Sequence, residues 1–331
     1  MKRALITGAA GFIGHHVVDH LLLNTDMELV LLDRLDCSGS VIRFQESEVF
    51  QKNKHRCHWV WWDLKASLNA LVRHKIGKHI THIYHLAAAS HVDRSITEPM
   101  SFVMDNVVGT GNLLDYARTL DELEKFFYFS TDEVFGPARF EDWYGFDELS
   151  RYNSKNPYAA SKAAAEQLCV AYENTYKLPI IITRCMNNFG ERQNVEKFVP
   201  LVIKKVLNDE TVQIHSDADK VKSGTRFYIH ARNTAAAVLF LTEKGKSGEF
   251  YNIVGEKEVS NLDMAHRIAA ILGKELKYEM IDFHSSRPGH DLRYAMSGKK
   301  MGQMGWRIPV SFDESLIKTV LWTVKHPQWL E

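Results

Sequence analysis

The stretch KRALITGAAGFIGHHVVDHLLLN, residues 2–24, decides the fold of this chain. It opens with the apolar pattern of a buried strand, and Phe12 to Asn24 has the pattern of an amphipathic helix. Three glycines lie in the turn between them: Gly8, Gly11 and Gly14. Glycine lets the backbone turn tightly and approach a pyrophosphate closely, while the start of the helix offers N–H groups to it. The stretch therefore predicts a dinucleotide site, although a glycine-rich turn that only packs the helix on the strand is the alternative.

The end of the next apolar run adds a second signal for a dinucleotide. ELVLLD, residues 28–33, ends in Asp33, about 20 residues past the glycines, where a carboxylate can accept hydrogen bonds from an adenosine ribose. An acid here repels a 2′-phosphate, so NAD is expected in preference to NADP, and the adjacent Arg34 is the feature that argues against this. Asp63, which ends the third run, is a candidate contact to the adenine, with an exposed acid that opens a helix as the alternative. The other residues expected at the cofactor are Phe12, Ile13, Leu64, Ala87 and Ser130.

Short apolar runs alternate with longer segments of helical period. The runs are KRALIT, ELVLLD, HWVWWD, HIYHLA, KFFYFST and PIIITR. This alternation is typical of βαβ units, so residues 1–186 are predicted to form a doubly wound, parallel α/β sheet of Rossmann type. Residues 187–331 mix helical segments with short strands and predict a smaller α+β lobe, with the segments around 225–243 as candidates to return to the first domain. No long linker separates the lobes, so they are expected to pack as one body with a cleft between them.

Composition limits the partners and the compartment. The 41 basic residues balance the 41 acidic ones, so no overall field attracts nucleic acid or an anionic membrane surface. The four cysteines lie far apart, which predicts neither a disulfide framework nor a metal site. No apolar run reaches the roughly 18 to 20 residues that a membrane span needs. We therefore expect a cytoplasmic protein whose partners include neither nucleic acid nor membrane.

Polar residues that suit acid–base chemistry follow the fifth apolar run. Asn156 and Pro157 open a helix that places Tyr158 and Lys162 one turn apart on the same face, where an ammonium can favour the phenolate form of a tyrosine. The fifth run ends in residues 130–133, Ser-Thr-Asp-Glu, at the sheet edge where ligands of such folds bind. Thr131, Asp132, Glu133, Tyr158 and Lys162 are therefore the candidate catalytic residues. A solvated helix face and a simple turn after a strand are the alternatives for the two groups.

Nine stretches, in this order along nearly the whole chain, carry a family resemblance. They are TGAAGFIG, HLAAASHVDRSI, NVVGT, STDEVFG, NPYAASKAAAE, CMNNFG, NVEKFVPLVI, YNIVG and RPGHDLRYA. Together they resemble the dTDP-glucose 4,6-dehydratase branch of the extended short-chain dehydrogenases/reductases. The glycine turn and the Tyr-Lys pair are shared by the wider superfamily, whereas related epimerases and decarboxylases differ at the places of Asp132 and Glu133. The resemblance therefore implies a nucleoside-diphosphate-hexose 4,6-dehydratase, a lyase of deoxysugar biosynthesis.

The same resemblance implies a role for each catalytic residue. Tyr158 removes the proton of the sugar C4 hydroxyl as the C4 hydride passes to NAD, while Thr131 and Lys162 position the reacting oxygens. Glu133 then removes the C5 proton that the new ketone acidifies, and Asp132 protonates the departing C6 hydroxyl. Two neighbouring carboxyl groups with opposite tasks require opposite protonation states, which crowding in a dry cleft favours.

The resemblance also assigns the lobe from 187 to 331 to the sugar nucleotide. The implied substrate residues are Ser90, Asn187, Asn188, Glu196, Lys197, Arg226, Asn252, Arg287 and His290. Taken singly, each basic side chain among them also fits an ordinary surface charge. The family is commonly dimeric, and Val107, Leu113, Leu114, Ala160, Ala164 and Leu168 predict a homodimer because their helices carry more apolar residues than one core-facing stripe needs.

Three positions depart from the family pattern. Ala89 replaces a usual Glu or Gln, Phe135 replaces a Tyr, and Asn233 stands where Asp is usual. The change at Ala89 opens space beside the sugar, which suggests UDP-N-acetylglucosamine as a substrate besides UDP-glucose and dTDP-glucose; 5-epimerisation of the product also stays open. The competing hypotheses are a C4 epimerase or decarboxylase on the same scaffold and a non-catalytic NAD-binding sensor.

Overall fold

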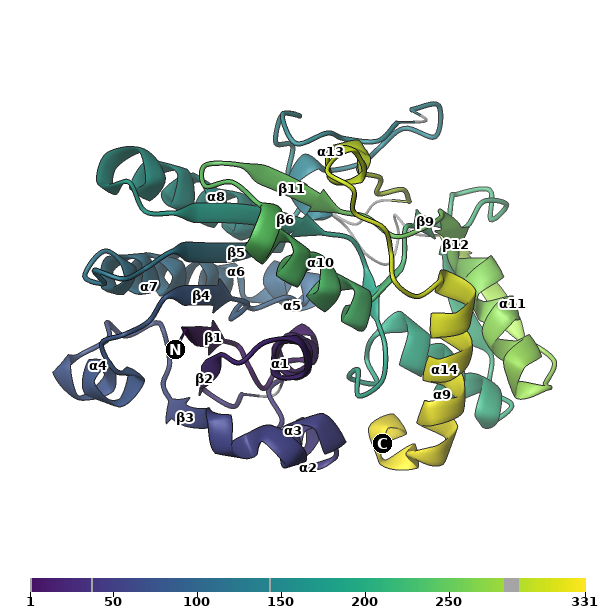
Figure 1. Ribbon diagram of the computed structural model, residues 1–331. Helices are drawn as coiled ribbons and strands as arrows, with labels where there is room; N and C mark the ends of the chain where they lie inside the picture. The colour runs from purple at the N-terminus through teal and green to yellow at the C-terminus, as the bar shows by residue number, and fades with distance from the viewer. Residues whose placement is uncertain (1, 37, 143, 283–291) are drawn as a thin grey trace.

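The computed structural model describes residues 2–36, 38–142, 144–282 and 292–331. Within these residues the centre of the molecule is a seven-stranded sheet (Figure 1). Its strands are β1 (Arg3–Thr7), β2 (Glu28–Asp33), β3 (Cys57–Trp61), β4 (His82–His85), β5 (Lys125–Thr131), β6 (Ile180–Cys185) and β11 (Phe250–Ile253). Their order is β11-β6-β5-β4-β1-β2-β3, and all neighbouring pairs are parallel. The predicted doubly wound α/β fold is confirmed.

Helices cover both faces of this sheet because alternate side chains of each central strand point to opposite sides. Ala4 and Ile6 of β1 join the apolar core on one face, and Leu5 joins the core on the other. The first face carries α1 (Phe12–Asn24), α2 (Ile42–Gln45), α3 (Glu48–Asn53) and α10 (Ala231–Lys244). The second carries α4 (Ala70–Ile76), α7 (Gly109–Ala117) and α8 (Pro157–Tyr176).

Short helical segments connect the strands near their carboxyl ends. They are the 3-10 turn η3 (Asp132–Phe135), the helices α5 (Val92–Thr97) and α6 (Pro99–Phe102), and the π-helical turn η2 (Val103–Val108), whereas the 3-10 turn η1 (Lys54–Arg56) lies at the amino end of β3. η3 begins directly after β5, and η2 leads directly into α7. Both turns therefore lie at the sheet edge where ligands of doubly wound folds bind.

A smaller lobe follows β6 and has its own core. Its helices are α9 (Phe198–Leu207), α11 (Asn261–Leu272), α14 (Phe312–Lys325) and the 3-10 turn η4 (Pro327–Leu330). α13 (Lys299–Gln303) packs instead against β11 and adds Met301 to the core on the first face of the sheet. The strand pairs of the lobe are β7 (Asn188–Phe189) with β10 (Ile229–His230), β8 (Val212–Ser216) with β13 (Tyr278–Asp282), and β9 (Thr225–Arg226) with β12 (Val259–Ser260). Residues of α9, α11 and α14 share one apolar core, so the lobe packs around helices.

Part of the C-terminal half returns to the sheet. β11 pairs with β6 and forms the edge of the sheet, and α10 packs against α1. Residues 231–253 thus add to the first unit, beyond the 225–243 segments that the sequence offered as candidates. The apolar run FYNI, residues 250–253, is typical of a strand, but an apolar pattern does not indicate which sheet the strand joins. The division at residue 186 stays a prediction for the rest of the chain.

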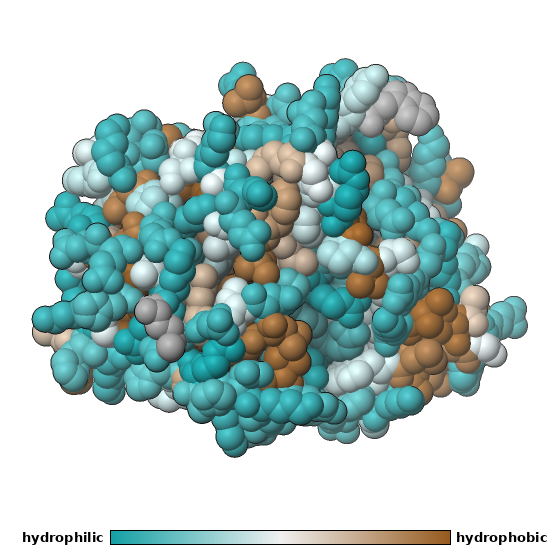
Figure 2. Space-filling view, in the orientation of Figure 1, coloured by the Kyte–Doolittle hydropathy of each residue, from teal (hydrophilic) through white to brown (hydrophobic). Residues whose placement is uncertain are grey.

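Hydrophilic side chains cover most of the face shown in Figure 2. An apolar patch at the right of that view lies over α14, where Ile317, Leu321 and Val324 are exposed. Among the described residues no helix is both long enough and apolar enough to span a membrane.

Candidate active site

Two cavities open at the carboxyl ends of the central strands and share several lining residues. The larger one, here the main cavity, measures about 440 Å³, and the smaller one, here the side cavity, about 90 Å³. Gly8 and Gly11 of the glycine turn line both. The main cavity also reaches Phe12, Ile13 and Gly14 at the start of α1. The predicted cofactor residues are therefore together at one place, where the helix end presents N–H groups to the opening.

The glycine turn is tight enough to exclude larger residues. Gly8 has φ +68°, and a Cβ atom added to it would lie 2.6 Å from the backbone nitrogen of Ala87. A Cβ on Gly14 would lie 2.1 Å from the carbonyl oxygen of Gly8. The turn therefore approaches the loop after β4 at backbone distance and brings the start of α1 directly against β1. These are the close approaches that a pyrophosphate-binding turn requires, so the chain fits a dinucleotide.

Asp33 lies at the end of β2 beside this turn. Its two carboxylate oxygens accept hydrogen bonds from the backbone N–H of Ala10 at 2.9 Å and of Leu35 at 2.8 Å. Burial raises the pKa of Asp33, and these amide hydrogen bonds oppose the shift. The carboxylate lines the side cavity together with Asp63, Leu64 and Ala87. Each carboxylate oxygen can accept a further hydrogen bond, so the residue can still receive a ribose hydroxyl.

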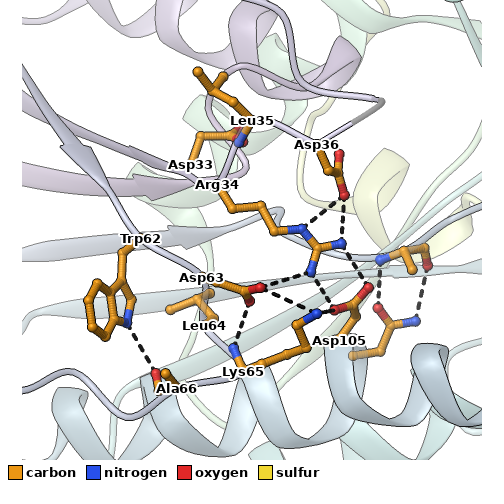
Figure 3. Close-up of polar contacts among 12 residues, drawn as sticks. Asp33, Arg34, Leu35, Asp36, Trp62, Asp63, Leu64, Lys65, Ala66 and Asp105 are labelled. Carbon is orange, nitrogen blue, oxygen red and sulfur yellow. Dashed lines mark hydrogen bonds and ion pairs between the residues drawn. The ribbon is translucent and has the colours of Figure 1, made fainter.

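The neighbouring Arg34 is held by carboxylates (Figure 3). Its guanidinium donates to both oxygens of Asp105, at 2.5 and 2.8 Å, and twice to Asp36, at 2.9 and 2.6 Å. It also lies 3.5 Å from Asp63, and Lys65 contacts Asp63 and Asp105 at 3.3 and 3.8 Å. We call Arg34, Asp36, Asp63, Lys65 and Asp105 the Arg34 cluster. All five line the side cavity.

The carboxylates after β5 occupy a turn that Thr131 organises. The Thr131 hydroxyl accepts from the backbone N–H of Glu133 at 3.3 Å and donates to Asp132 at 3.0 Å. Asp132 is buried, and its second carboxylate oxygen has no hydrogen-bond partner among the described residues. Burial raises the pKa of Asp132 to about 6, while the Thr131 hydrogen bond and the charge of Arg226 oppose the shift. The affinity of Asp132 for a proton is thus higher than that of a free aspartate, which is the direction that the acid role implied by the resemblance requires.

Glu133 is oriented by the residue that begins the next helix. The side-chain amide of Asn156 donates to the carboxylate of Glu133 at 3.0 Å. The amide oxygen of the same residue accepts from the backbone N–H of Ala159 at 2.8 Å and caps α8. Asn156 therefore fixes the start of the Tyr158 helix and the direction of Glu133 with one side chain. The sequence indicated the cap and missed the contact with Glu133.

Tyr158 and Lys162 both line the main cavity, but not in the predicted relation. The ammonium of Lys162 donates to the backbone carbonyl of Phe129 at 2.5 Å and lies 4.3 Å from the ring centre of Tyr128. Burial, and then the charges of Glu133 and Asp132, raise the pKa of Tyr158, and a hydrogen bond with Thr131 opposes this. The expected lowering by an adjacent ammonium is therefore wrong for this structure, because the carbonyl of Phe129 takes the ammonium. Burial lowers the pKa of Lys162 to about 8.

The predicted substrate residues divide into four groups, of which Asn252 forms the last. Those that line the main cavity are Ser90, Asn187, Asn188, Glu196 and Lys197, while Ser130 lines it beside the catalytic turn. Arg226 is absent from the lining of the main cavity; its guanidinium donates to the carbonyls of Thr225 and Leu292 at 2.7 and 2.8 Å and lies 4.5 Å from the ring centre of Tyr294. Arg287 and His290 lie outside the described residues.

Asn252 lies apart from this site. It lines a separate cavity of about 600 Å³, and its side-chain amide donates to the carbonyls of Phe146 and Ser297 at 3.2 and 3.4 Å. Its place on β11 explains this, because β11 is the far edge strand of the sheet. The sequence pattern could not show that position, and the structure gives Asn252 a bracing role between loops.

The departures from the family pattern have different surroundings. Ala89 lines the main cavity, and both of its backbone polar groups bond to the side chain of Asn106, at 2.8 and 3.1 Å. Phe135 is fully buried with its ring 5.3 Å from that of Phe146, and Asn233 is buried and donates to the carbonyl of Val310. Only Ala89 is placed to touch a substrate.

Several residues of the main cavity carried no sequence signal that pointed to the site. They are Asp36, His91, Arg94, Asp105, Cys185, Gln193 and Asn194. Arg94 and His91 face Glu196 across the cavity, at 3.3 and 3.9 Å. Among the residues that the structure describes, no group of three His, Cys, Asp or Glu side chains is arranged to hold a metal ion.

Comparison with known proteins agrees with this geometry. The model of the family described as GDP-mannose 4,6 dehydratase matches residues 5–319. The chain belongs to this family. The resemblance to 4,6-dehydratases of the extended short-chain dehydrogenase/reductase type is thereby confirmed.

The similarity to individual proteins extends over nearly the whole chain. The dTDP-glucose 4,6-dehydratase 1 of Escherichia coli (strain K12) is 36% identical, over 99% of this chain and 94% of that protein. The solved structure of a dTDP-glucose 4,6-dehydratase from Streptomyces venezuelae with NAD bound has a TM-score of 0.86 at 32% identity and covers 99% of both chains. A UDP-glucuronic acid 4-epimerase from Bacillus cereus, solved with UDP-glucuronic acid and NAD, has a TM-score of 0.84 at 25% identity and covers 98% of this chain and 99% of its own. The fold is thus common to enzymes of different chemistry, and the side chains of the site must distinguish them.

Proposed function

We propose that this chain is an NAD-dependent nucleoside-diphosphate-hexose 4,6-dehydratase, a hydro-lyase that converts its substrate to the 4-keto-6-deoxy sugar nucleotide. The observation that carries the proposal is the catalytic turn, in which Asp132 and Glu133 meet Tyr158 in one cavity with the glycine turn. Asp132 has a raised pKa, and Asn156 orients Glu133. An acid and a base side by side are what the removal of water from a sugar requires. The relatives named above support the same activity.

The cofactor would lie along the two cavities. Gly8, Gly11 and Gly14 with the start of α1 would hold the pyrophosphate, and Asp33 would accept the adenosine ribose hydroxyls. Lys162 would hold the nicotinamide ribose. NAD supplies the acceptor for the C4 hydride and the donor that restores it to the sugar.

Three side chains of the catalytic site would carry out the proton transfers. Tyr158 accepts the proton of the C4 hydroxyl, and its hydrogen bond with Thr131 opposes the rise in its pKa that burial causes. Glu133 removes the C5 proton once C4 is a ketone, and Asp132 delivers a proton to the departing C6 hydroxyl. Burial of Asp132 raises its pKa to about 6, which favours the protonated form that this step needs. This division of labour needs two carboxyl groups in opposite states, which the structure supports through desolvation of one and a hydrogen-bond donor on the other.

The proposal also concerns which hexose the substrate carries. Ala89 lies in the cavity wall next to Ser90, and its methyl group leaves space where a longer side chain would stand. A 2-acetamido group needs that space, so UDP-N-acetylglucosamine is proposed to be accepted as well as or better than UDP-glucose or dTDP-glucose. Epimerisation at C5 would follow if the proton returned to the other face of the sugar.

A C4 epimerase is the second candidate, because a 4-epimerase of the same fold is among the structural neighbours. Such an enzyme needs the tyrosine and the cofactor. It has no water to expel and no C5 proton to remove, so Asp132 and Glu133 would lack a task. The catalytic turn therefore favours the dehydratase. The non-catalytic sensor is disfavoured because every predicted catalytic side chain lines the cavity.

One experiment separates these functions. The full chain is incubated separately with dTDP-glucose, UDP-glucose and UDP-N-acetylglucosamine, and the products are read by NMR. A dehydratase gives a C6 methyl signal and a C4 ketone, an epimerase gives the C4 epimer with its C6 hydroxyl intact, and a sensor gives no product. Ala89→Glu is the matched variant for the sugar: it should reduce kcat/KM for the acetamido substrate more than for the glucose substrates. An undiminished preference for the acetamido sugar in this variant would contradict the role of Ala89.

We also propose a cytoplasmic homodimer. Cys57, Cys169 and Cys185 are free thiols, which supports a reducing compartment. Leu113 and Leu114 are fully buried within the chain itself and must be withdrawn from the predicted interface. Exposed apolar side chains on α6, η2 and α8 support an interface on that side instead: Met100, Met104, Ala160 and Ala164. A monomeric mass by light scattering at micromolar concentration would contradict the dimer.

A further inference from the structure

The side cavity contains an unusual concentration of charge beside the place where an adenosine ribose would bind. Four carboxylates and two cations line it: Asp33, Asp36, Asp63, Asp105, Arg34 and Lys65. With the ordinary charges of these groups, acids outnumber bases by two. A cluster with a negative surplus repels a further phosphate at its rim.

Arg34 is the residue that could reverse this preference. An arginine near the acid at the end of the second strand can accommodate the 2′-phosphate of NADP. Here the guanidinium is bound edge-on by both oxygens of Asp105 and by Asp36, and these bonds, those of Asp105 foremost, raise its pKa above the ordinary value. A bidentate arginine–carboxylate pair is strong and directional, so the guanidinium is withheld from other anions.

Asp105 is held in place by the turn that carries it. It belongs to η2, the π-helical turn Val103–Val108, and is nearly buried, with 9% of its side chain exposed. The next residue, Asn106, bonds both backbone polar groups of Ala89 and donates to the hydroxyl of Ser161 at 2.8 Å. The turn is thus fixed to the cavity wall and to the catalytic helix. Asp105 cannot follow Arg34 if the arginine turns away, whereas Asp36 lies in a more exposed segment.

We propose that Asp105, acting through Arg34, determines the cofactor choice of this pocket: it locks the guanidinium so that the pocket takes a dinucleotide with a free 2′-hydroxyl and rejects one with a 2′-phosphate. Asp105 is a positioning residue in this scheme, and Asp33 is the group that meets the ribose. The inference rests on the proposed function, because it concerns the same dinucleotide site. It converts Arg34 from a feature that favours NADP into part of the barrier against NADP.

The test measures bound nucleotide and does not depend on turnover. The full chain and its variants are incubated with NAD and NADP in equal amounts, desalted and denatured, and the released nucleotides are quantified by chromatography. Asp105→Asn should raise the ratio of bound NADP to bound NAD by about tenfold, since it removes one charge and one partner of the guanidinium. Asp36→Asn should shift the ratio in the same direction by less, and serves if Asp105→Asn folds poorly.

Two controls separate charge from structure. Asp115→Asn removes the same charge from α7, where Asp115 pairs with Arg118, and should leave the ratio unchanged. Adding Arg34→Met to Asp105→Asn should return the ratio to the wild-type value, because the freed guanidinium is the proposed phosphate ligand. A merely structural role of Asp105 would lower both nucleotides together without changing their ratio.

The outcomes are distinguishable. A wild-type chain that retains neither nucleotide would overturn the proposed function and the inference with it. A wild-type chain that retains NAD, combined with an unchanged ratio in both Asp105→Asn and Asp36→Asn, would overturn the inference alone. A rise that persists after Arg34→Met would contradict the role assigned to Arg34.

Discussion

The Arg34 cluster and the catalytic turn place carboxylates at the same edge of one sheet and treat them in opposite ways. In the cluster, burial alone would raise the pKa values of Asp36 and Asp63, but hydrogen bonds from backbone amides and the charge of Arg34 hold both below their usual range, and Lys65 adds to this at Asp63. In the turn, Asp132 lacks a partner for one oxygen, and burial raises its pKa to about 6. The compared carboxylates have equivalent positions on the fold, since Asp36 follows β2, Asp63 follows β3 and Asp132 follows β5.

This difference shows how one sheet edge supports recognition and proton transfer together. Paired carboxylates keep a fixed charge, which selects or rejects a charged ligand. A buried carboxyl group in which one oxygen lacks a hydrogen-bond partner has its proton affinity raised toward neutral pH, which suits an acid catalyst. The chemistry of each region therefore follows from what surrounds the carboxylate.

The largest effect is expected at Tyr158, the group that both carboxylates of the catalytic turn influence. Tyr158→Phe removes the proton acceptor for C4 oxidation and should lower kcat by about 10²- to 10⁴-fold. Tyr176→Phe, at the exposed end of the same helix, is the matched control and should retain full activity. Product formation is followed by NMR. Activity of Tyr158→Phe within a few per cent of the control would exclude the phenol as the base.

His85, the last residue of β4, tests how burial changes a pKa when no neighbouring charge opposes the shift. His85 bonds Thr7 and Thr110 at 2.7 and 2.9 Å, and burial, followed by the charge of Lys162, lowers its pKa to about 3. The unfolded chain binds a proton here below about pH 6.5 and the folded chain does not, so this contribution to stability is present above pH 6.5 and is lost as the pH falls.

The stability measurement compares the wild type with His85→Gln. Between pH 7 and pH 5 the wild type should lose about 2 kcal/mol more of its free energy of unfolding than the variant, which does not titrate. Denaturant unfolding at the two pH values gives the difference, and the other histidines cancel in it. Equal losses in the two proteins would show that His85 is protonated in the folded state.

The smallest effect is expected at Asn156, which joins the helix cap to Glu133. Asn156→Ser keeps a capping oxygen and loses the contact with the carboxylate, so kcat should fall about tenfold with stability nearly unchanged. Asn156→Ala should lose the cap as well and cost about 1 kcal/mol of stability in addition. Paired kinetics and thermal unfolding separate the two losses. A serine variant with full activity would show that Glu133 does not need this donor.

The sequence predicted those parts of the site that are contiguous along the chain. The glycine turn, Asp33 and the run from Thr131 to Glu133 depend on local geometry, which residue types and spacing express directly. Tyr158 and Lys162 were placed on one helix face correctly, but their surroundings were not. The spacing of two residues along a helix shows which face they share but not how deeply they are buried. It therefore could not predict the raised pKa of Tyr158 or the hydrogen bond from Lys162 to the carbonyl of Phe129.

The parts that the sequence did not show are contacts between distant segments. Arg34 meets Asp105 from 71 residues away, and β11 joins β6 after most of the smaller lobe has intervened. Which acid pairs with Arg34, and which strand pairs with β6, is decided only in the folded chain. The sequence contains many other acids and apolar runs that could have formed these pairs. Asn252 illustrates the same limit, because the family resemblance assigned it to the substrate and the structure puts it beside another cavity.

The central claim, that Glu133 and Asp132 act as base and acid, is tested most directly by exchange at C5 in heavy water. The wild type should place deuterium at C5 of a 4-keto-6-deoxy product. Glu133→Gln should oxidise C4, accumulate reduced cofactor and leave C5 without deuterium, whereas Asp132→Asn should exchange C5 and fail to release water. Exchange at C5 at the wild-type rate in Glu133→Gln would contradict the account.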